Sequence, residues 1–177
     1  MGNNPGRGFS EFFTEGQFQT QTEVLEVTKK KQNLQIGIPK EVHYGENRVA
    51  LVPNSIRALI GAGHSVLIES EAGLKSNFTD ADYIEAGAKI SPTRTEVFKS
   101  DALIKVAPPS MDEIELMHAD QLLISPLHLP VLNDKYIEAL KKKRVTAVAI
   151  EYVQASDGSF PIVRMMSELA GAASILT

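Results

Sequence analysis

The sequence predicts an α/β protein, with a parallel sheet of about six strands and helices on both faces, of the flavodoxin-like or Rossmann-like kind. Three observations lead to this fold class. From Leu34 onward, short apolar runs alternate about six times with amphipathic segments, and the connections are short. Runs such as "VTAVAI" (145–150) show no polar alternation, which is typical of parallel strands buried on both faces. Residues 1–33 lack this pattern altogether.

Residues 1–33 are therefore predicted to form an N-terminal arm, separate from a domain at 34–177. The arm is rich in glycine, glutamine, threonine and charge, and it has few aliphatic side chains from which to build a core. One short helix could form at 22–31. Because the arm also carries several phenylalanines, we expect it to be partly helical and packed on a neighbour, or else disordered.

The first half of the domain is expected to alternate strands and helices, which span, in chain order, 34–39, 53–63, 64–70, 79–88, 89–91 and 93–100. The first strand is apolar and ends in proline. The first helix can be capped by Asn54 or Ser55, and it stops at two glycines. The second helix has Thr79 as its expected N-cap, with acidic residues in the first turn.

The second half continues the same alternation, with elements at 101–107, 108–120, 121–129, 132–144, 145–153 and 165–177. The helix at 108–120 opens with Ser110-x-x-Glu113, the pattern of a capping box. The helix at 132–144 ends in "KKKR", where cations complement the helix dipole, so this basic run needs no nucleic-acid role.

Composition excludes several classes of protein. The chain has 177 residues, 43% of them hydrophobic and 23% charged, which is ordinary for a globular domain. A net charge of -4 argues against a nucleic-acid surface, and no apolar run reaches the ~20 residues of a membrane span. The absence of cysteine removes disulfides and cysteine-based metal sites, and no secretion signal is recognisable. We expect a cytoplasmic enzyme or binding domain without a metal site.

Candidate site residues follow from the fold class, because parallel sheets bind ligands beyond the carboxyl ends of their strands. Arg48 lies in the loop after the first strand, Lys105 in the fourth strand, and His128 at the tip of the fifth. Ser167 lies near the expected start of the last helix. Two cations and an imidazole at one sheet edge suit a small carboxylate.

Each candidate also has a plainer interpretation. Arg48 could be solvated or held in a surface ion pair. Lys105, in an apolar strand, must either reach solvent at the strand end or meet an anion, because an unpaired buried ammonium is costly. His128 could be a hydrogen-bonded core histidine, and Ser167 could simply belong to a helix N-terminus. The remaining histidines show no ligand spacing and are expected at the surface: His43, His64 and His118.

No Gly-x-Gly-x-x-Gly and no P-loop occurs in these 177 residues. "GAGHS" and "EAGAK" mark the ends of helices rather than phosphate cradles. The chain as given therefore carries no nucleotide-binding fingerprint of its own.

Five linked motifs carry a family resemblance: "GIPKEVHYGENRVALVP", "AGHSVLIESEAGLKSNFTDADYIEAGAKI", "ALIKVAPPS", "LLISPLHL" and "MMSELAG". From about Gln35 onward the chain resembles the N-terminal domain shared by alanine dehydrogenase and the alpha subunit of NAD(P) transhydrogenase. The histidine of "LHL" and the glutamate of "MSE" resemble the alanine dehydrogenase side more closely.

The resemblance implies roles for the candidate residues. Arg48 of "RVA" would hold the substrate carboxylate, His128 of "LHL" would act as acid and base, and Ser167 of "MSE" would contact NAD. Imidazole suits acid–base work because it titrates near neutral pH. The implied reaction is L-alanine, NAD and water to pyruvate, ammonia and NADH, in a homo-oligomer.

Two departures from the family pattern stand out. Alanine dehydrogenases usually carry "KVKEP", whose second lysine binds substrate; here the segment is "KVAPP", and Ala107 takes that place. Lys105 matches the first lysine. The segment thus moves toward the "KVNAP" form of transhydrogenases. In addition, the family continues into a Rossmann NAD domain, which is not part of these 177 residues. We expect the chain to be either a fragment of a longer enzyme or a stand-alone domain, and we expect no dehydrogenase turnover from it by itself.

Three functions therefore stand as hypotheses: the substrate-binding domain of an alanine dehydrogenase-like oxidoreductase, a transhydrogenase alpha-subunit domain, and a non-catalytic binding or assembly module. In the first two the parent protein is an enzyme, and its ligand is a small amino acid or 2-oxo acid such as alanine or pyruvate.

Overall fold

The computed structural model describes residues 33–131 and 133–174, so the arm predicted for 1–33 lies almost wholly outside the described residues. The strands are β1 Gln35–Ile38, β2 Ser65–Glu69, β3 Lys89–Ser91, β4 Ala102–Ile104, β5 Leu122–Ser125 and β6 Thr146–Ala149. The helices are α1 Pro53–Gly61, α2 Asp80–Glu85, α3 Arg94–Val97, α4 Met111–Leu116, α5 Asp134–Lys143 and α6 Pro161–Ser174, with short 3₁₀ turns η2 Leu74–Ser76, η3 Leu129–Val131 and η4 Ile150–Tyr152.

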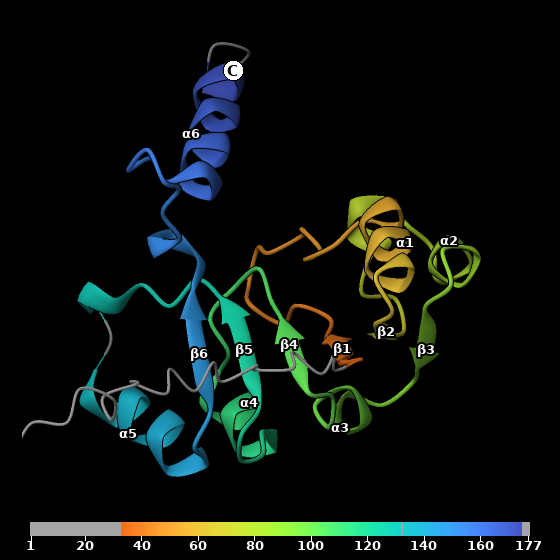
Figure 1. Ribbon diagram of the computed structural model, residues 1–177, viewed down its shortest axis with the longest axis horizontal. Coiled ribbons are helices and arrows are strands. Elements are labelled where there is room, and N and C mark those ends of the chain that lie inside the picture. Colours follow the sequence, from red (N-terminus) through yellow and green to blue (C-terminus); the bar gives the residue numbers. More distant parts are fainter. Residues whose placement is uncertain (1–32, 132, 175–177) are drawn as a thin grey trace, which may run out of the picture. The chain divides into compact units, whose positions relative to one another are not determined.

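The predicted sheet is confirmed. All six strands run parallel, in the order β3-β2-β1-β4-β5-β6 (Figure 1). The chain leaves β1 toward β2 and β3, and later returns to the other side of β1 to place β4. The direction of winding therefore changes between β1 and β4, which is where doubly wound sheets open a crevice at their carboxyl ends.

Two apolar clusters show that helices cover both faces of the sheet. In the first, Ile56 of α1 and Tyr83 of α2 pack against side chains of β1 and β2. In the second, Ile114 of α4 and Leu140 of α5 pack against Leu103 and its neighbours on β4 and β5. The alternation of side chains along each strand sends successive residues into different clusters.

The expectation that Asn54 or Ser55 caps the first helix is wrong: α1 begins at Pro53, its N-cap is Val52, and no side chain in the described part of the chain caps it. The two other capping signals are confirmed. Thr79 caps α2 and Ser110 caps α4, and in both cases the third residue returns the hydrogen bond as a capping box. At β1 a backbone contact requires glycine, because a Cβ at Gly37 would lie 2.6 Å from the carbonyl oxygen of Val97.

The expectation that "VTAVAI" is buried on both faces is wrong for β6. Its residues alternate between exposed and half-buried, and Val148 is 37% exposed. The reason is topological: β6 is the last strand of the sheet and pairs only with β5. An apolar run alone does not distinguish a central strand from an edge strand.

The last helix begins earlier than predicted, at Pro161 rather than at residue 165. Proline is well tolerated in the first helical turn, since its missing N–H has no partner there. Figure 1 shows α6 leading away from the carboxyl end of β6, and none of its residues is buried. None of the helices in the described part of the chain has the length and apolarity that crossing a bilayer requires.

Candidate active site

Loops from three strands meet in a pocket of about 260 Å³ at the carboxyl ends of the sheet. Arg48 comes from the loop after β1 and His128 from the loop after β5. Between them lie residues that follow β4 or belong to the Arg48 loop: His43, Glu46, Val106, Ala107 and Pro108. Arg48 and His128, predicted separately from sequence, are thus brought to one pocket, which is called the carboxylate pocket below.

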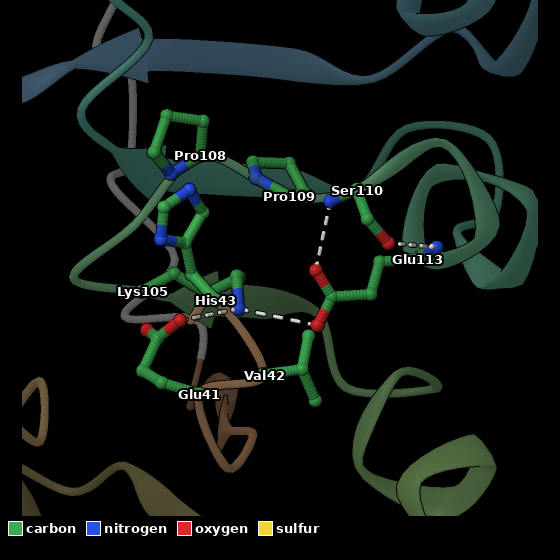
Figure 2. A pocket seen from close by; sticks show the side chains of 8 residues that line it. All are labelled: Glu41, Val42, His43, Lys105, Pro108, Pro109, Ser110 and Glu113. Atoms are coloured by element: carbon green, nitrogen blue, oxygen red, sulfur yellow. Dashed lines mark hydrogen bonds and ion pairs between the residues drawn. The ribbon is translucent and has the colours of Figure 1, made fainter. Parts of the chain in front are cut away.

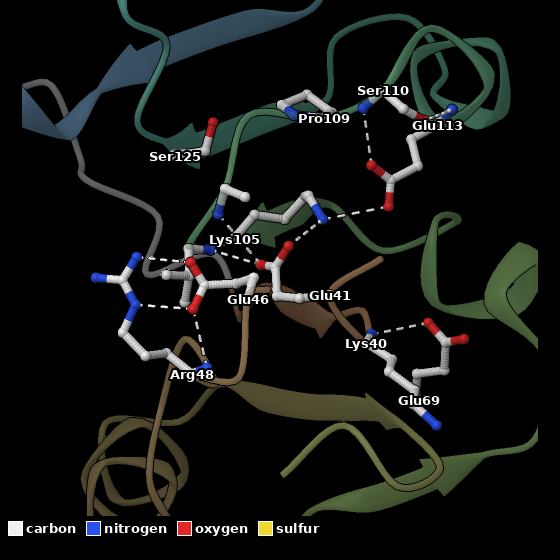
Figure 3. Close-up of polar contacts among 12 residues, drawn as sticks. Lys40, Glu41, Glu46, Arg48, Glu69, Lys105, Pro109, Ser110, Glu113 and Ser125 are labelled. Atoms are coloured by element: carbon white, nitrogen blue, oxygen red, sulfur yellow. Dashed lines mark hydrogen bonds and ion pairs between the residues drawn. The ribbon is translucent and has the colours of Figure 1, made fainter. Parts of the chain in front are cut away.

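Arg48 is held by Glu46. Its Nε donates to Oε1 at 2.8 Å and its Nη2 to Oε2 at 2.6 Å, while its backbone N–H donates to Oε1 at 2.9 Å (Figure 3). The guanidinium lowers the pKa of Glu46 to about 2, and the same hydrogen bonds raise the pKa of Arg48. The ion-pair interpretation of Arg48 is therefore confirmed for this structure, and the side chain is still 55% exposed toward the pocket.

His128 is not a core histidine. It is exposed, and it has a left-handed backbone with φ of 53°, which histidine adopts more readily than most residues. The buried member of the "LHL" motif is Leu127, at 5% exposure. The turn therefore buries a leucine and presents the imidazole to the pocket.

Glu151 fixes this turn, and sequence reasoning assigned it no such role. One carboxylate oxygen accepts the backbone N–H of His128 at 2.7 Å and that of Leu127 at 3.0 Å. Burial raises the pKa of Glu151, but hydrogen bonds from its own N–H and from these two groups outweigh burial and lower it overall. A carboxylate that binds successive N–H groups in this way stabilises a left-handed turn.

Lys105 meets anions, and those anions belong to the protein. It is 2% exposed, and its Nζ lies 2.8 Å from Oε2 of Glu41 and 3.2 Å from Oε1 of Glu113 (Figure 2). The alternative that this ammonium reaches solvent at the strand end is wrong. Lys105 lines a second pocket, of about 270 Å³, beside the carboxylate pocket, and direct contact with a substrate stays a prediction.

Glu41 joins the two pockets through the backbone. While its Oε2 binds Lys105, its Oε1 accepts the N–H of Val106 at 2.6 Å and that of Ala107 at 3.4 Å (Figure 3). The residue after "GIPK" thus holds the chain that forms one wall of the carboxylate pocket. The sequence marked Glu41 only as a residue near a strand end, because its partners lie more than 60 positions away.

Further charges surround this buried cluster. Arg94 donates to both oxygens of Glu69 at 3.2 Å and approaches Oε1 of Glu113 at 3.5 Å. Its Nη2 also donates to the carbonyl of Lys40 at 2.7 Å. The cluster therefore contains two cations, Lys105 and Arg94, and three carboxylates, those of Glu41, Glu69 and Glu113.

Ser167 lies in the middle of α6 rather than at its start, and its hydroxyl donates to the carbonyl of Val163 at 2.9 Å. It lines a mainly apolar pocket of about 450 Å³ together with His128, Glu151 and residues of α6 such as Met166. His128 is thus shared by this apolar pocket and the carboxylate pocket.

The other histidines differ from one another. His43 and His118 are exposed, as expected. His64 is half-buried, because its Nδ1 accepts the N–H of Leu34 at 3.2 Å. Within residues 33–131 and 133–174, no group of three His, Asp or Glu side chains is placed to hold a metal ion.

Comparison with known proteins relates this site to a family. Residues 37–170 match the family model "Alanine dehydrogenase/PNT, N-terminal domain". The alanine dehydrogenase of Staphylococcus epidermidis is 44% identical over 138 residues, which are 78% of this chain and 37% of that protein. The alanine dehydrogenase of Methanococcus maripaludis is 45% identical over 141 residues, covering 79% and 38%.

Solved structures agree with the sequence matches. An L-alanine dehydrogenase superposes with a TM-score of 0.77 at 39% identity, over 80% of this chain and 39% of the other. A transhydrogenase from Sinorhizobium meliloti gives a TM-score of 0.62 at 32% identity, over 66% and 35%. The chain thus spans little more than a third of the relatives that it matches.

Proposed function

Because the chain belongs to the family of alanine dehydrogenase/PNT N-terminal domains, we propose that it is the substrate-side domain of an alanine dehydrogenase-like oxidoreductase. The reaction of the parent enzyme is L-alanine, water and NAD to pyruvate, ammonia and NADH. The observation that carries this proposal is one pocket, beyond the carboxyl ends of a parallel sheet, that holds both Arg48 and His128.

Arg48 is proposed to bind the substrate carboxylate. Its hydrogen bonds to Glu46 use the N–H of Nε and one N–H of Nη2. Within the described residues, Nη1 donates no hydrogen bond, so this nitrogen remains for a ligand. Glu46 orients the guanidinium in advance, and a planar fork suits a carboxylate.

His128 is proposed as the acid and base. In the direction of pyruvate formation, C2 would first lose its hydride to NAD, which leaves an imine; His128 would then accept a proton from the water that attacks C2 of this imine and return it to the nitrogen that leaves as ammonia. Glu151 acts indirectly, because it fixes the backbone of the turn that carries the imidazole. Lys105 acts on the same wall through Glu41, and its direct contact with substrate stays a prediction.

NAD supplies the hydride acceptor in this reaction. We propose that the apolar pocket beside α6, whose lining includes Ser167 and His128, receives the nicotinamide end. The sequence contains no glycine-rich loop for the pyrophosphate. We therefore propose that NAD is bound mainly by a domain outside these 177 residues, as the partial coverage of the relatives supports.

The parent protein is proposed to be a cytoplasmic homo-oligomer. Support for oligomerisation comes from α6, where Met165, Met166 and Leu169 are 40–61% exposed and form an uncovered apolar strip. The cytoplasmic location rests on composition, since the chain has no cysteine.

Ligand binding gives the direct test of the carboxylate pocket. The 177-residue chain is titrated with pyruvate and, as a matched neutral ligand, with pyruvamide, while amide and imidazole NMR signals are followed. We expect shifts around Arg48 and His128 with pyruvate, and their loss in Arg48→Met. Equal shifts with pyruvamide, or an unchanged response in Arg48→Met, would contradict a carboxylate site.

Turnover distinguishes the candidate functions. This chain is fused to the remainder of the Staphylococcus epidermidis relative, and NADH formation from alanine is measured. We expect activity that Arg48→Met and His128→Asn abolish; asparagine is chosen because it tolerates the left-handed backbone at this position.

A second candidate, a transhydrogenase alpha-subunit domain, is favoured by one observation: Ala107 lines the pocket where a lysine of alanine dehydrogenases is expected. Hydride transfer between nucleotides without any dependence on alanine would select it. Absence of both activities, together with no pyruvate binding, would favour a non-catalytic module.

A further inference from the structure

The charges around the carboxylate pocket cancel almost completely. Arg48 contributes one positive charge and Glu46 removes it, because the pKa of Glu46 lies near 2 and its carboxylate is ionised at neutral pH. A ligand carboxylate that enters this pocket therefore meets one free edge of a neutral ion pair. A second cation would strengthen the charge-assisted bond that Arg48 can donate to such a ligand.

Lys105 does not supply that cation. Its ammonium is buried between two carboxylates, and releasing it would leave Glu41 without a cation and Glu113 with only the 3.5 Å contact to Arg94. Arg94 is bound to Glu69 and approaches Glu113 in the same way. The nearby fixed cations are thus committed to the protein's own carboxylates.

Two imidazoles remain at the carboxylate pocket, His43 and His128. His128 is the proposed acid and base, so its protonation must change during the reaction and cannot supply a constant charge. His43 has no proposed role in the reaction. It lines both the carboxylate pocket and the second pocket, which contains Lys105, and its ring lies beside Pro108 (Figure 2). It is therefore the group whose charge can follow ligand binding.

The geometry of His43 indicates which atom takes up the proton. Its Nδ1 lies 3.2 Å from the carbonyl oxygen of Tyr44, which can only accept, so Nδ1 carries the hydrogen. Nε2 is then the basic nitrogen. The other charged or titratable groups that line the two pockets come from the same loop, the exit of β4, α4 and the exit of β5: Glu41, Glu46, Arg48, Lys105, Glu113 and His128.

We propose that His43 takes up a proton on Nε2 when a small carboxylate binds beside Arg48, and so supplies the second positive charge of the carboxylate pocket. The inference rests on the proposed function, since it concerns the same pocket. It makes binding of a carboxylate proton-linked, so that affinity rises as pH falls.

Calorimetric titration of the 177-residue chain with pyruvate, at pH values from 5.5 to 8.5, tests this linkage. Pyruvate itself stays ionised over this range. For uptake of one proton, the affinity rises by at most about tenfold per pH unit, and we expect it to rise as pH falls across this series. In His43→Gln the affinity becomes weak and nearly independent of pH.

Two further variants sharpen the test. His43→Lys places a permanent charge at this position, and we expect it to keep high affinity at pH 8.5, where the unchanged protein binds weakly. His118→Gln is the matched control: His118 is also exposed, its Nδ1 lies 2.9 Å from the carbonyl of Ala119, and it lines neither pocket. It should keep the original pH dependence.

The outcomes separate this inference from the proposed function. A pH slope that persists in His43→Gln and disappears in His128→Asn overturns the role of His43, while loss of binding in Arg48→Met still supports the carboxylate pocket. A pyruvate affinity that is independent of pH in the unchanged protein also overturns the role of His43. No pyruvate binding at any pH overturns both.

Discussion

Two groups of charged side chains lie side by side at the carboxyl ends of β1 and β4, and they differ in access to water. In the Lys105 cluster, the side chains of Lys105, Glu41 and Glu113 are 0%, 6% and 3% exposed. In the carboxylate pocket, the Arg48 side chain is 55% exposed and its partner Glu46 is 12% exposed. Both groups contain short ion pairs, but only the Arg48 side chain is open to solvent.

This difference teaches that burial, rather than ion-pair distance, separates the Lys105 cluster from Arg48, the residue proposed to bind a ligand carboxylate. The Lys105–Glu41 and Arg48–Glu46 contacts are equally short, at 2.8 and 2.6 Å. A buried pair cannot lose one partner without leaving a charge in a poorly solvated place. An exposed arginine can exchange a water molecule for a ligand oxygen at little cost.

The largest expected effect comes from breaking the buried cluster. Lys105→Met should lower the free energy of unfolding by about 3–5 kcal/mol, because the buried carboxylate of Glu41 loses its cation and that of Glu113 keeps only Arg94 at 3.5 Å. Arg48→Met is the matched control, and it should cost less than about 1 kcal/mol because this ion pair is exposed. Urea denaturation measures both values, and equal losses would refute the comparison.

Arg48→Met, which is expected to change stability little, should have a large effect on ligand affinity. Arg48→Met is expected to weaken pyruvate binding roughly 10- to 100-fold, since a hydrogen bond to a charged group contributes ~1.5–3 kcal/mol. Arg48→Lys keeps the charge but loses the planar fork, so an intermediate affinity is expected. Calorimetry with pyruvate measures the changes; an affinity in Arg48→Met within twofold of the original would contradict the assignment.

A smaller effect is expected from adding a charge to the carboxylate pocket. Ala107 lines this pocket although it is 7% exposed, and Ala107→Lys would place an ammonium there. We expect pyruvate affinity to rise up to about tenfold, most clearly at pH 8.5, where imidazoles are neutral. Ala107→Met controls for the added bulk. An unchanged affinity would mean that another group already supplies the charge.

The smallest effect concerns the stability that Glu46 contributes and its dependence on pH. The folded pKa of Glu46, about 2, lies below its ordinary value of 4.5. Its contribution is therefore fully present above about pH 4.5 and is lost as pH falls toward 2. Glu46→Gln should be slightly less stable at pH 7, and the difference should shrink between pH 4.5 and 2. A difference that grows in acid would show that the pairing is absent in solution.

Local features of the chain were predictable because their causes lie within a few residues. The capping boxes at Thr79 and Ser110 each involve groups three positions apart, so the sequence displays both partners together. The alternation of strands and helices likewise follows from the periodicity of apolar residues. The parallel sheet then placed Arg48 and His128 at the same edge.

Features that depend on distant partners were not predictable. Glu151 lies 23 positions from the His128 turn that it holds, and Glu41 lies 64 positions from Lys105. The exposure of β6 depends on its place at the edge of the sheet. The sequence around Glu151 and Glu41 does not show that these carboxylates bind residues far along the chain.

The sequence by itself determined the α/β class, the succession of strands and helices along the chain, and the residues that could contact an anionic ligand. Only the tertiary structure decided which cation is free for that purpose. The physical reason is that an ion pair depends on distance and solvation together. Lys105 and Arg48 are both cations near strand ends in the sequence, but folding surrounds one with buried carboxylates and leaves the other open to a pocket.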